Sequence, residues 1–280
     1  MVIFKRVYDI KNYISLQKAN NIRIGFVPTM GALHAGHISL IQKAKADGGL
    51  VVCSIFLNPT QFNDKKDLDK YPVSTEADIE LLINAGCDVL FLPPVDEIYP
   101  TGEEVKTYDF GYLDSILEGA KRPGHFRGVG QVVSRLLEIV EPGYLYLGQK
   151  DYQQCMVISK LVKMMGLEKT EVVVCPTTRE ADGLAMSSRN RRLTEPERIV
   201  ASTIYQCLVS ILSKQNISSF EIVRKECEDI LGANGFSTEY VALADARDLS
   251  PMDDFSKDIP MVALIAARIG EIRLIDNMLL

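Results

Sequence analysis

The sequence has only three histidines, no H-E-x-x-H motif and no C-x-x-C pair among its six cysteines. These are the usual ligand spacings of protein zinc sites, so the pattern predicts no such centre. All the cysteines stand among apolar residues, which is typical of buried free thiols in a reducing compartment and predicts a cytoplasmic protein. They are Cys53, Cys87, Cys155, Cys175, Cys207 and Cys227.

Long hydrophobic runs are also missing. No apolar run approaches the ~20 residues that a membrane helix needs. The first residues, Met1–Arg6, lead into a polar stretch without the charged-then-apolar order of a signal peptide. We therefore expect a cytosolic protein that does not span a membrane.

The sequence also lacks a strongly basic patch. The formal net charge is −6 and the pI is about 5.3, and basic residues occur in scattered pairs such as Arg191 and Arg192. This balance would repel a phosphate backbone, so nucleic acid is not an expected partner. The remaining composition, 47% hydrophobic and 24% charged, is that of an ordinary globular protein.

Short β-branched apolar runs alternate with helix-period segments from residue 22 to about residue 175. This alternation is typical of β-α-β units around a buried parallel sheet. Residues 128–140 place apolar side chains on one face and stop at Pro142-Gly143, which predicts an amphipathic helix on that sheet. The predicted strands are 22–27, 50–57, 88–92, 144–147 and 171–175.

The pattern changes after Pro176, where a polar loop precedes two helical segments and three short strands. We therefore predict two domains in the 280-residue chain. A larger α/β domain with a Rossmann-like, doubly wound parallel sheet covers residues 1–176, and a smaller α+β domain covers residues 177–280. The helices predicted in the smaller domain are 195–213 and 219–231, and its strands are 239–243, 261–268 and 271–276.

Two of the three histidines, His34 and His37, stand in the segment Pro28–His37, directly after a predicted strand and before a helix. In an open parallel sheet, ligands bind beyond the carboxyl ends of the strands, where a helix offers N–H groups and its positive dipole end to phosphates. Gly36 permits close backbone approach. This H-x-G-H sequence therefore suits stabilisation of charge on a nucleotide's phosphates.

Two other interpretations of the pair remain open. The histidines could be surface residues at a helix start, or half of a metal site. H-x-G-H after a strand resembles the signature of the HIGH-type nucleotidyl transferases. That superfamily includes pantothenate synthetases, several adenylyl- and cytidylyltransferases and class I aminoacyl-tRNA synthetases.

Four later segments narrow the resemblance, and they occur in the expected order. Together with Pro28–His37, they resemble the pantothenate synthetase family, the pantoate–β-alanine ligases, densely from residue 23 to 195 and weakly beyond. The segments read Cys-Ser-Ile-Phe-Leu-Asn-Pro-Thr-Gln-Phe-Asn at 53–63, Arg-Pro-Gly-His-Phe-Arg-Gly-Val at 122–129, Gly-Gln-Lys-Asp-Tyr-Gln-Gln at 148–154 and Pro-Thr-Thr-Arg-Glu-Ala-Asp-Gly-Leu-Ala-Met-Ser-Ser-Arg-Asn at 176–190.

The resemblance implies an ATP site made from three segments and one further residue. Met30–His37 resembles the ATP-binding turn, Gly148–Asp151 a second phosphate and ribose segment, and Met186–Arg189 a mobile phosphate-binding loop. Thr178 matches a position that contacts adenine through its backbone. The implied catalytic residues are His37 as general acid, His34, Lys150 and Arg189. The implied ATP-binding residues are Met30, Gly31, Ala32, Leu33, His34, Ala35, Gly36, His37, Gly148, Gln149, Lys150, Asp151, Thr178, Met186, Ser187, Ser188 and Arg189.

Two glutamines are the implied substrate residues. Gln61 resembles the residue that binds both pantoate and β-alanine, and Gln154 resembles a second pantoate contact; amides suit hydroxyl and carboxylate oxygens. Without the resemblance, Asn58 and Gln61 would pass as turn residues and Gln154 as a capping partner of Asp151.

Four other positions bear on the resemblance. His125 and Arg122 resemble part of the wall of the site. Gln149 and Gln131 depart from the family, which commonly has Glu and Thr at these positions. The first departure removes a charge from the ATP segment but leaves its neighbours Lys150 and Asp151 in place.

The resemblance implies a two-step reaction. The carboxylate of pantoate attacks the α-phosphorus of Mg-ATP and releases pyrophosphate; the amine of β-alanine then attacks the adenylate, releasing AMP and forming pantothenate. Mg²⁺ is expected mostly on the ATP phosphates, with Asp78 and Asp88 as candidate protein ligands. The smaller domain is expected to act as a lid that excludes water, and the family implies a homodimer through the larger domain.

Two alternatives use the same residues differently. Another HIGH-type nucleotidyltransferase would share His34 and His37 but would have no use for the Gln61 and Gln154 pair. A regulatory module that binds an adenine nucleotide would bind without turnover. An aminoacyl-tRNA synthetase fragment is disfavoured by the acidic charge balance.

Overall fold

A computed structural model describes residues 1–62 and 68–280, so Asn63, at the end of the 53–63 motif, lies outside the described residues. The described chain divides into two compact units. The first unit contains Met1–Gly148 and Gln153–Pro176, and the second contains Gln149–Tyr152 and Thr177–Leu280. The short segment Gln149–Tyr152 therefore groups with the C-terminal part of the chain.

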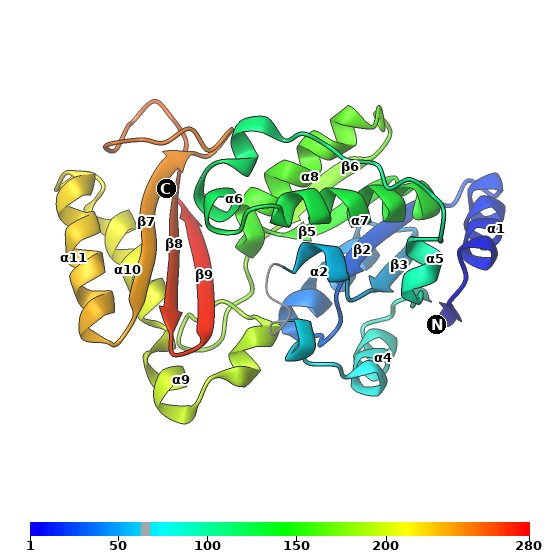
Figure 1. Ribbon diagram of the computed structural model, residues 1–280, viewed down its shortest axis with the longest axis horizontal. Helices are drawn as coiled ribbons and strands as arrows, with labels where there is room; N and C mark the ends of the chain where they lie inside the picture. The colour runs from blue at the N-terminus through cyan, green and yellow to red at the C-terminus, as the bar shows by residue number, and fades with distance from the viewer. Residues whose placement is uncertain (63–67) are drawn as a thin grey trace. The chain divides into compact units, whose positions relative to one another are not determined.

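The described residues of the first unit form a six-stranded sheet in which every paired neighbour is parallel (Figure 1). The strand order β1-β4-β3-β2-β5-β6 places β2 between β3 and β5, so the chain winds outward from β2 in both directions. Such a reversal is the switch point at which open α/β sheets bind ligands. The strands are β1 (Val2–Phe4), β2 (Ile24–Thr29), β3 (Leu50–Ile55), β4 (Val89–Phe91), β5 (Tyr144–Gly148) and β6 (Glu171–Cys175).

Helices cover both faces of this sheet, as the doubly wound prediction requires. On one face, α2 (Ala35–Ala46) and α4 (Thr75–Asn84) bury Leu40, Ile41 and Leu82 in one apolar cluster with the strands. The long helix α7 (His125–Val140) packs on β2 outside that cluster, alongside α1 (Val7–Ala19) (Figure 1). The other helical segments of this part of the chain are η1 (Pro59–Gln61), α5 (Val95–Ile98), η2 (Gly111–Asp114), α6 (Leu117–Lys121) and α8 (Tyr152–Met164).

The five predicted strands of this sheet and its amphipathic helix are confirmed, although α7 begins at His125, three residues before the predicted start. The sequence reasoning missed β1 and α1. β1 has only three residues, and Val2 and Ile3 are exposed on an edge strand. Arg6 makes no side-chain cap for α1, so the start signal that sequence reasoning uses is missing there.

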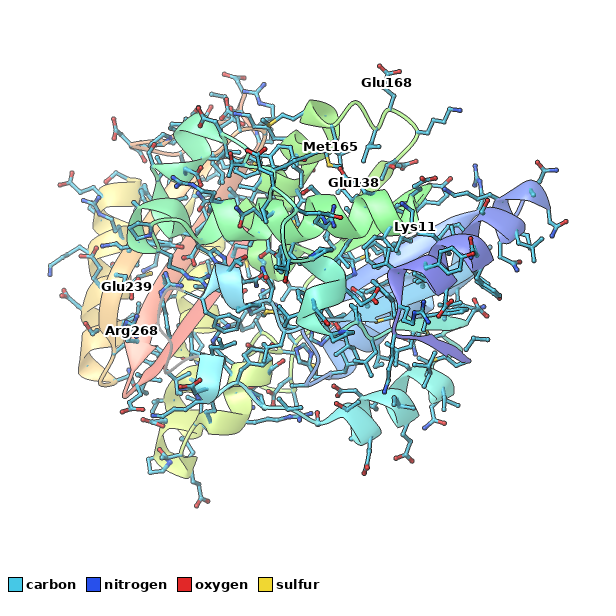
Figure 2. All side chains as sticks on the ribbon, turned by 45° about the vertical axis from the view of Figure 1, so that its right-hand side comes forward. Lys11, Glu138, Met165, Glu168, Glu239 and Arg268 are labelled. Atoms are coloured by element: carbon cyan, nitrogen blue, oxygen red, sulfur yellow. The ribbon has the colours of Figure 1, made fainter. Side chains whose placement is uncertain are left out.

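The second unit contains a three-stranded antiparallel sheet, β7-β8-β9, with helices packed against it. Glu239 of β7 accepts hydrogen bonds from Arg268 of β8 and Arg273 of β9, so two ion pairs join the three strands. Figure 2 labels Glu239 and Arg268. The predicted helix 195–213 is divided at Ser202, and the α+β prediction is otherwise confirmed. The elements are η3 (Gln149–Asp151), η4 (Ser188–Arg192), α9 (Glu195–Ala201), α10 (Thr203–Lys214), α11 (Phe220–Ala233), β7 (Ser237–Asp245), β8 (Met261–Ile269) and β9 (Ile272–Leu279).

The remaining predictions from composition concern cysteines and membrane helices. All six cysteines are free and buried, as their apolar surroundings predict. Within residues 1–62 and 68–280, no helix has the length and apolar character needed to cross a membrane.

Candidate active site

The turn between β2 and α2 carries both histidines, and their own side chains cap the helix. His34 is the N-cap residue of α2, and its Nδ1 accepts a hydrogen bond of 3.2 Å from the Gly36 N–H. In return, Nδ1 of His37 accepts a bond of 3.4 Å from the His34 N–H. This is a reciprocal capping box, built here from two imidazoles. The spacing of the two histidines therefore has a structural reason beside any chemical one.

These backbone contacts determine the tautomer of each neutral ring. A ring nitrogen that accepts a hydrogen bond carries no proton, so Nδ1 of His34 and Nδ1 of His37 are both unprotonated in this arrangement. The proton of a neutral ring then lies on Nε2. Each Nε2–H is a donor of the type that charge on a phosphate oxygen needs.

The carboxylate of Asp78 supports the same turn from α4. Its Oδ2 accepts a hydrogen bond of 2.8 Å from the Ala32 N–H, and its Oδ1 accepts one of 2.8 Å from the Leu33 N–H. Ser74 donates a further bond to Oδ1 at 3.0 Å. Ala32 has φ 51°, a conformation that costs a non-glycine residue energy, and these bonds help to fix it. Asp78, 1% exposed, is thus arranged as a support of the turn.

A cavity of about 220 Å³ opens beside this turn within the first unit. Met30, Gly31 and Ala32 form one wall, and residues 55–57 at the end of β3 and 92–95 after β4 form others. The turn therefore borders a concave surface beyond the carboxyl ends of the strands, where ligands of open α/β sheets bind.

The loop after β3 holds Gln61 in a buried polar network. Asn58 is 1% exposed, and its Nδ2 donates to Gln61 Oε1 at 3.1 Å and to the Gly128 carbonyl at 3.2 Å. Asn58 Oδ1 accepts from the Tyr99 hydroxyl at 2.9 Å. Gln61 Nε2 in turn donates to Met30 Sδ at 3.0 Å. The structure therefore joins the predicted substrate residue to the predicted ATP turn.

Helix α7 sets the position of this loop. Gly128 of α7 lies close to the loop that carries Gln61. A Cβ added at Gly128 would lie 2.4 Å from the Thr60 carbonyl oxygen and 2.7 Å from the Gln61 Cα. His125, at the start of the helix, makes a bond of 3.0 Å from Nδ1 to the Gln61 carbonyl. Its Nε2 lies 3.0 Å from Arg122 Nη1, which can only donate. Nδ1 therefore carries the ring proton and donates to the loop.

The two glutamines at the start of α8, Gln153 and Gln154, differ in their hydrogen bonding. Gln153 is 2% exposed; its Oε1 accepts from the Glu118 N–H, and its Nε2 donates to the carbonyls of Leu113 and Ile116. Gln154 is half-buried, and its side chain makes no hydrogen bond with the described residues. The arrangement assigns Gln153 to structure and leaves the amide of Gln154 available to a ligand.

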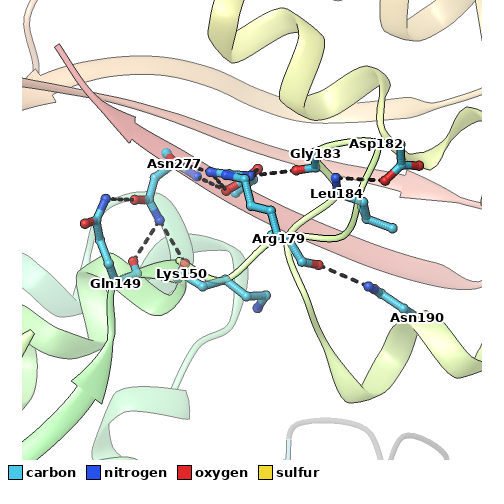
Figure 3. A network of polar contacts seen from close by, with 10 residues as sticks. Gln149, Lys150, Arg179, Asp182, Gly183, Leu184, Asn190 and Asn277 are labelled. Atoms are coloured by element: carbon cyan, nitrogen blue, oxygen red, sulfur yellow. Dashed lines mark hydrogen bonds and ion pairs between the residues drawn. The ribbon is translucent and has the colours of Figure 1, made fainter. Parts of the chain in front are cut away.

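In the second unit, η3 presents Lys150 from a nearly buried position. Its side chain is 18% exposed, and Nζ lies 3.4 Å from Asp151 Oδ1. The carbonyls of Gln149 and Lys150 both accept hydrogen bonds from Asn277 of β9 (Figure 3). The conformation of the predicted ATP segment 149–151 is therefore linked to the last strand of the chain.

The loop 177–190, which contains Thr178 and Met186–Arg189, is also held by hydrogen bonds within this unit. The Met186 N–H donates to the Thr178 carbonyl at 3.0 Å, which brings both ends of the loop together. Ser187 caps η4 by accepting from the Arg189 N–H. The carboxylate of Asp276 forms a two-point ion pair with Arg179; burial raises the pKa of Asp276, and the guanidinium opposes that rise. The first residues of this loop are therefore held on β9 through Arg179.

Two buried oxygens near this loop, Thr177 Oγ1 and Asn190 Oδ1, have no hydrogen-bond partner among the described residues. An unpaired buried polar atom is costly, so each is a candidate to bind water or a ligand. Over the same described ranges, no three His, Cys, Asp or Glu side chains gather as a metal site.

The structure thus brings the predicted residues together in two groups. The first unit holds Met30–His37, Gln61, Gly148 and Gln154, and the second holds Gln149–Asp151, Thr178 and Met186–Arg189. The predicted segment 148–151 is therefore divided between the two units after Gly148. Sequence reasoning missed the supporting residues. It treated Asn58 as a turn residue and Asp78 as a candidate magnesium ligand, because the partners of both are distant in the sequence.

A doubly wound parallel sheet with a histidine-capped helix at its switch point defines an α/β protein of the nucleotide-binding class. The sequence pattern of one family, described as Pantoate-beta-alanine ligase, matches residues 2–279. The chain belongs to the pantoate–β-alanine ligase family. The family resemblance of the motifs, the predicted fold class and the implied pantoate–β-alanine ligase are confirmed.

Relatives match the chain over its whole length. It is 43% identical over 286 residues to a pantothenate synthetase of Cytophaga hutchinsonii, covering 100% of this chain and 99% of the relative. It is 44% identical over 278 residues to a pantothenate synthetase of Porphyromonas gingivalis, covering 99% and 98%.

Solved structures agree. The crystal structure of pantothenate synthetase from Thermus thermophilus superposes with a TM-score of 0.92 at 38% identity, covering 99% of both chains. The pantoate–β-alanine ligase of Francisella tularensis, whose crystal structure is complexed with β-γ ATP and β-alanine, gives a TM-score of 0.82 at 39% identity, covering 100% of this chain and 97% of that one.

Proposed function

We propose that this protein condenses (R)-pantoate with β-alanine through a pantoyl-adenylate, using ATP and releasing AMP and pyrophosphate. Family membership supports the ligase activity. The observation that carries the proposal is the bond from Gln61 Nε2 to Met30 Sδ. It links an amide suited to an acid substrate with a turn suited to a nucleotide, so the two substrates of an adenylation would be bound side by side.

The residues of the first unit suit the adenylation step. Pantoate's carboxylate is already a nucleophile, so the protein needs to orient it and to stabilise charge. In this proposal Gln61 and Gln154 bind pantoate, and His34 and His37 donate through Nε2–H to the phosphate oxygens. His37 acts as the general acid. Asp78 and Asn58 act indirectly by fixing the turn and the loop.

The residues of the second unit are proposed to bind the nucleotide. Lys150 and Arg189 would neutralise phosphate charge, Ser187 and Ser188 would donate hydroxyl hydrogen bonds, and Thr178 would contact the base. In the Francisella tularensis structure the bound molecules are a β-γ ATP and β-alanine, which supports ATP as the nucleotide here. That residues 177–280 serve as a lid stays a prediction.

Three further properties belong to this proposal. Mg²⁺ would enter with ATP, bound to its phosphates, because both oxygens of Asp78 accept hydrogen bonds from the backbone. The protein would be cytoplasmic, where its six free thiols stay reduced. It would form a homodimer, as the family resemblance implies.

The test is pyrophosphate and AMP release from Mg-ATP with pantoate, with and without β-alanine, for the wild type and for His37→Ala. We expect pyrophosphate with pantoate alone, and AMP with pantothenate once β-alanine is added. A folded, ATP-binding protein that releases no pantoate-dependent pyrophosphate would reject this function and favour another HIGH-type nucleotidyltransferase. ATP binding without turnover of any acid would favour the regulatory module.

A further inference from the structure

Asn277 lies on β9, 128 positions after the segment that it contacts, and is 2% exposed. Its Nδ2 donates to the Gln149 carbonyl at 2.9 Å and to the Lys150 carbonyl at 2.9 Å (Figure 3). Its Oδ1 accepts from Gln149 Nε2 at 3.2 Å. The whole side-chain amide is therefore engaged with η3.

The orientation of this amide is fixed by its partners. Two backbone carbonyls can only accept, so Nδ2 of Asn277 must face them and Oδ1 must face Gln149. Oδ1 in turn requires a donor, which the Nε2 of Gln149 supplies. A glutamate at position 149 would place a carboxylate oxygen against Oδ1, and turning the Asn277 amide over would place Oδ1 against two carbonyls.

The neighbouring residue, Asp276, connects the same strand to the loop that begins at Thr177. Asp276 binds Arg179 through two hydrogen bonds, and Arg179 Nη2 also donates to the Asn277 carbonyl at 3.3 Å. The Arg179 guanidinium lies 4.5 Å from the centroid of the Tyr205 ring. The end of β9 therefore fixes both η3 and the start of the loop that begins at Thr177.

We infer that Asn277 is a positioning residue for Lys150, and that Gln149 is the amide partner that this asparagine requires. The inference rests on the proposed role of Lys150 at the ATP phosphates. Two consecutive carbonyls bonded to one side chain fix the backbone from which Lys150 projects. Glutamine at position 149 can donate to Asn277 Oδ1, whereas a glutamate there could not.

The first test is a double-mutant cycle on ATP affinity, measured by calorimetry with Mg²⁺ and without pantoate. As a single substitution, Asn277→Ala should weaken ATP binding by about tenfold, because about that much affinity is lost with one well-made hydrogen-bonded contact. In Lys150→Ala we expect it to change affinity by less than about twofold, since the residue it positions is gone. The exposed Asn216→Ala is the matched control, with wild-type affinity expected.

The second test uses position 149 and does not depend on Lys150→Ala. Gln149→Glu should bind ATP at least about threefold more weakly than Gln149→Ala, because the carboxylate opposes Oδ1 while alanine only leaves it unpaired. In an Asn277→Ala background the two variants should differ by less than about twofold. The exposed Gln206→Glu adds the same charge elsewhere in the unit and should bind like the wild type. If Asn277→Ala does not fold, Asn277→Leu, which also lacks the Oδ1 oxygen, replaces it.

The outcomes separate this inference from the proposed function. The inference would be overturned if Asn277→Ala reduced ATP affinity equally with and without Lys150. It would also be overturned if Gln149→Glu and Gln149→Ala still differed in ATP affinity after Asn277 was removed. A Lys150→Ala protein with wild-type ATP affinity would overturn it too. Each of these results leaves pantoate-dependent pyrophosphate release by the wild type intact. Loss of that release in the wild type would reject the proposed function instead.

Discussion

The ring centroids of His34 and His37 lie 4.1 Å apart, with the rings tilted by 39°. Each ring accepts a backbone hydrogen bond through Nδ1, so their helix-capping role and their proposed chemical role use different atoms. The two roles can therefore be separated by substitution.

His37→Asn should separate them. Asparagine Oδ1 can take the place of Nδ1 and accept from the His34 N–H, but nothing takes the place of Nε2. We expect stability close to the wild type and a kcat lower by roughly 10²–10⁴, the usual range for a general acid. His37→Ala should lose a further ~0.5–2 kcal/mol of stability, as for a lost cap. Urea unfolding and pyrophosphate release measure the two effects; a His37→Asn enzyme with wild-type kcat would exclude His37 as the acid.

Asp78→Asn should loosen the turn. One carboxylate oxygen becomes an NH₂ group that faces a backbone donor, so we expect a loss of about 1–3 kcal/mol in the free energy of unfolding. ATP binding should weaken at the same time because the turn carries the histidines. Glu80→Gln, an exposed change of the same kind on α4, should leave both unchanged. Wild-type stability combined with a higher Mg²⁺ requirement would instead identify Asp78 as a metal ligand.

Gly128→Ala should displace the loop that carries Gln61. The new methyl group would lie 2.4 Å from the Thr60 carbonyl oxygen, so the loop or α7 must move. We expect kcat/KM for pantoate to fall by roughly 10²-fold, the cost of about 1 Å of misplacement. Affinity for ATP should change little.

Gly232→Ala is the matched control, because Gly232 lies within α11 and nothing would lie within 4 Å of its added Cβ. Alanine should stabilise that helix by about 0.5–1 kcal/mol. If Gly128→Ala has full activity, the close approach of α7 does not determine the position of the loop.

Burial raises the pKa of the Cys87 thiol to about 11. At pH 8 only about one thiol in a thousand would be ionised, so Cys87 should resist disulfide reagents until the protein unfolds. Unfolding lowers the pKa towards 9.0, so the thiol favours the folded state fully below pH 9 and loses this contribution as pH rises from 9 to about 11. Labelling followed by mass spectrometry measures the reactivity.

Cys87→Ala provides the comparison for the pH dependence. Its stability should fall less steeply than that of the wild type between pH 9 and about 11, measured by urea unfolding at each pH. Rapid labelling of Cys87 in the folded wild type would contradict the burial argument.

The fold was predictable where local pattern and tertiary environment agree. β2, β3 and β5 are buried on both faces, so they read as continuous apolar runs between turn signals. β1 and α1 lack such signals: one is a three-residue edge strand, and the other follows an uncapped Arg6. Pairing with β4 determines the position of β1, and sequence pattern carries no information on that contact.

The candidate site was predictable only for residues that resemble a motif. His34, His37 and Gln61 stand in dense motifs, whereas Asn277 lies beyond residue 195, where the resemblance is weak. Asp78 lies 45 and 46 positions from the N–H groups it binds. Neither contact leaves a spacing signal, because the fold brings the partners together. The proposed roles of the motif residues stay predictions until the variants are measured.

The contact of Asp78 with the turn has a consequence for how the sequence can change over time. Asp78 binds the N–H groups of Ala32 and Leu33, which every residue except proline possesses. Substitutions at positions 32 and 33 therefore preserve this support as long as the new side chains fit, while position 78 must keep a carboxylate of the same length. This contact therefore limits change at position 78 more than at positions 32 and 33, where the φ of 51° at Ala32 and the burial of both side chains set the limits instead.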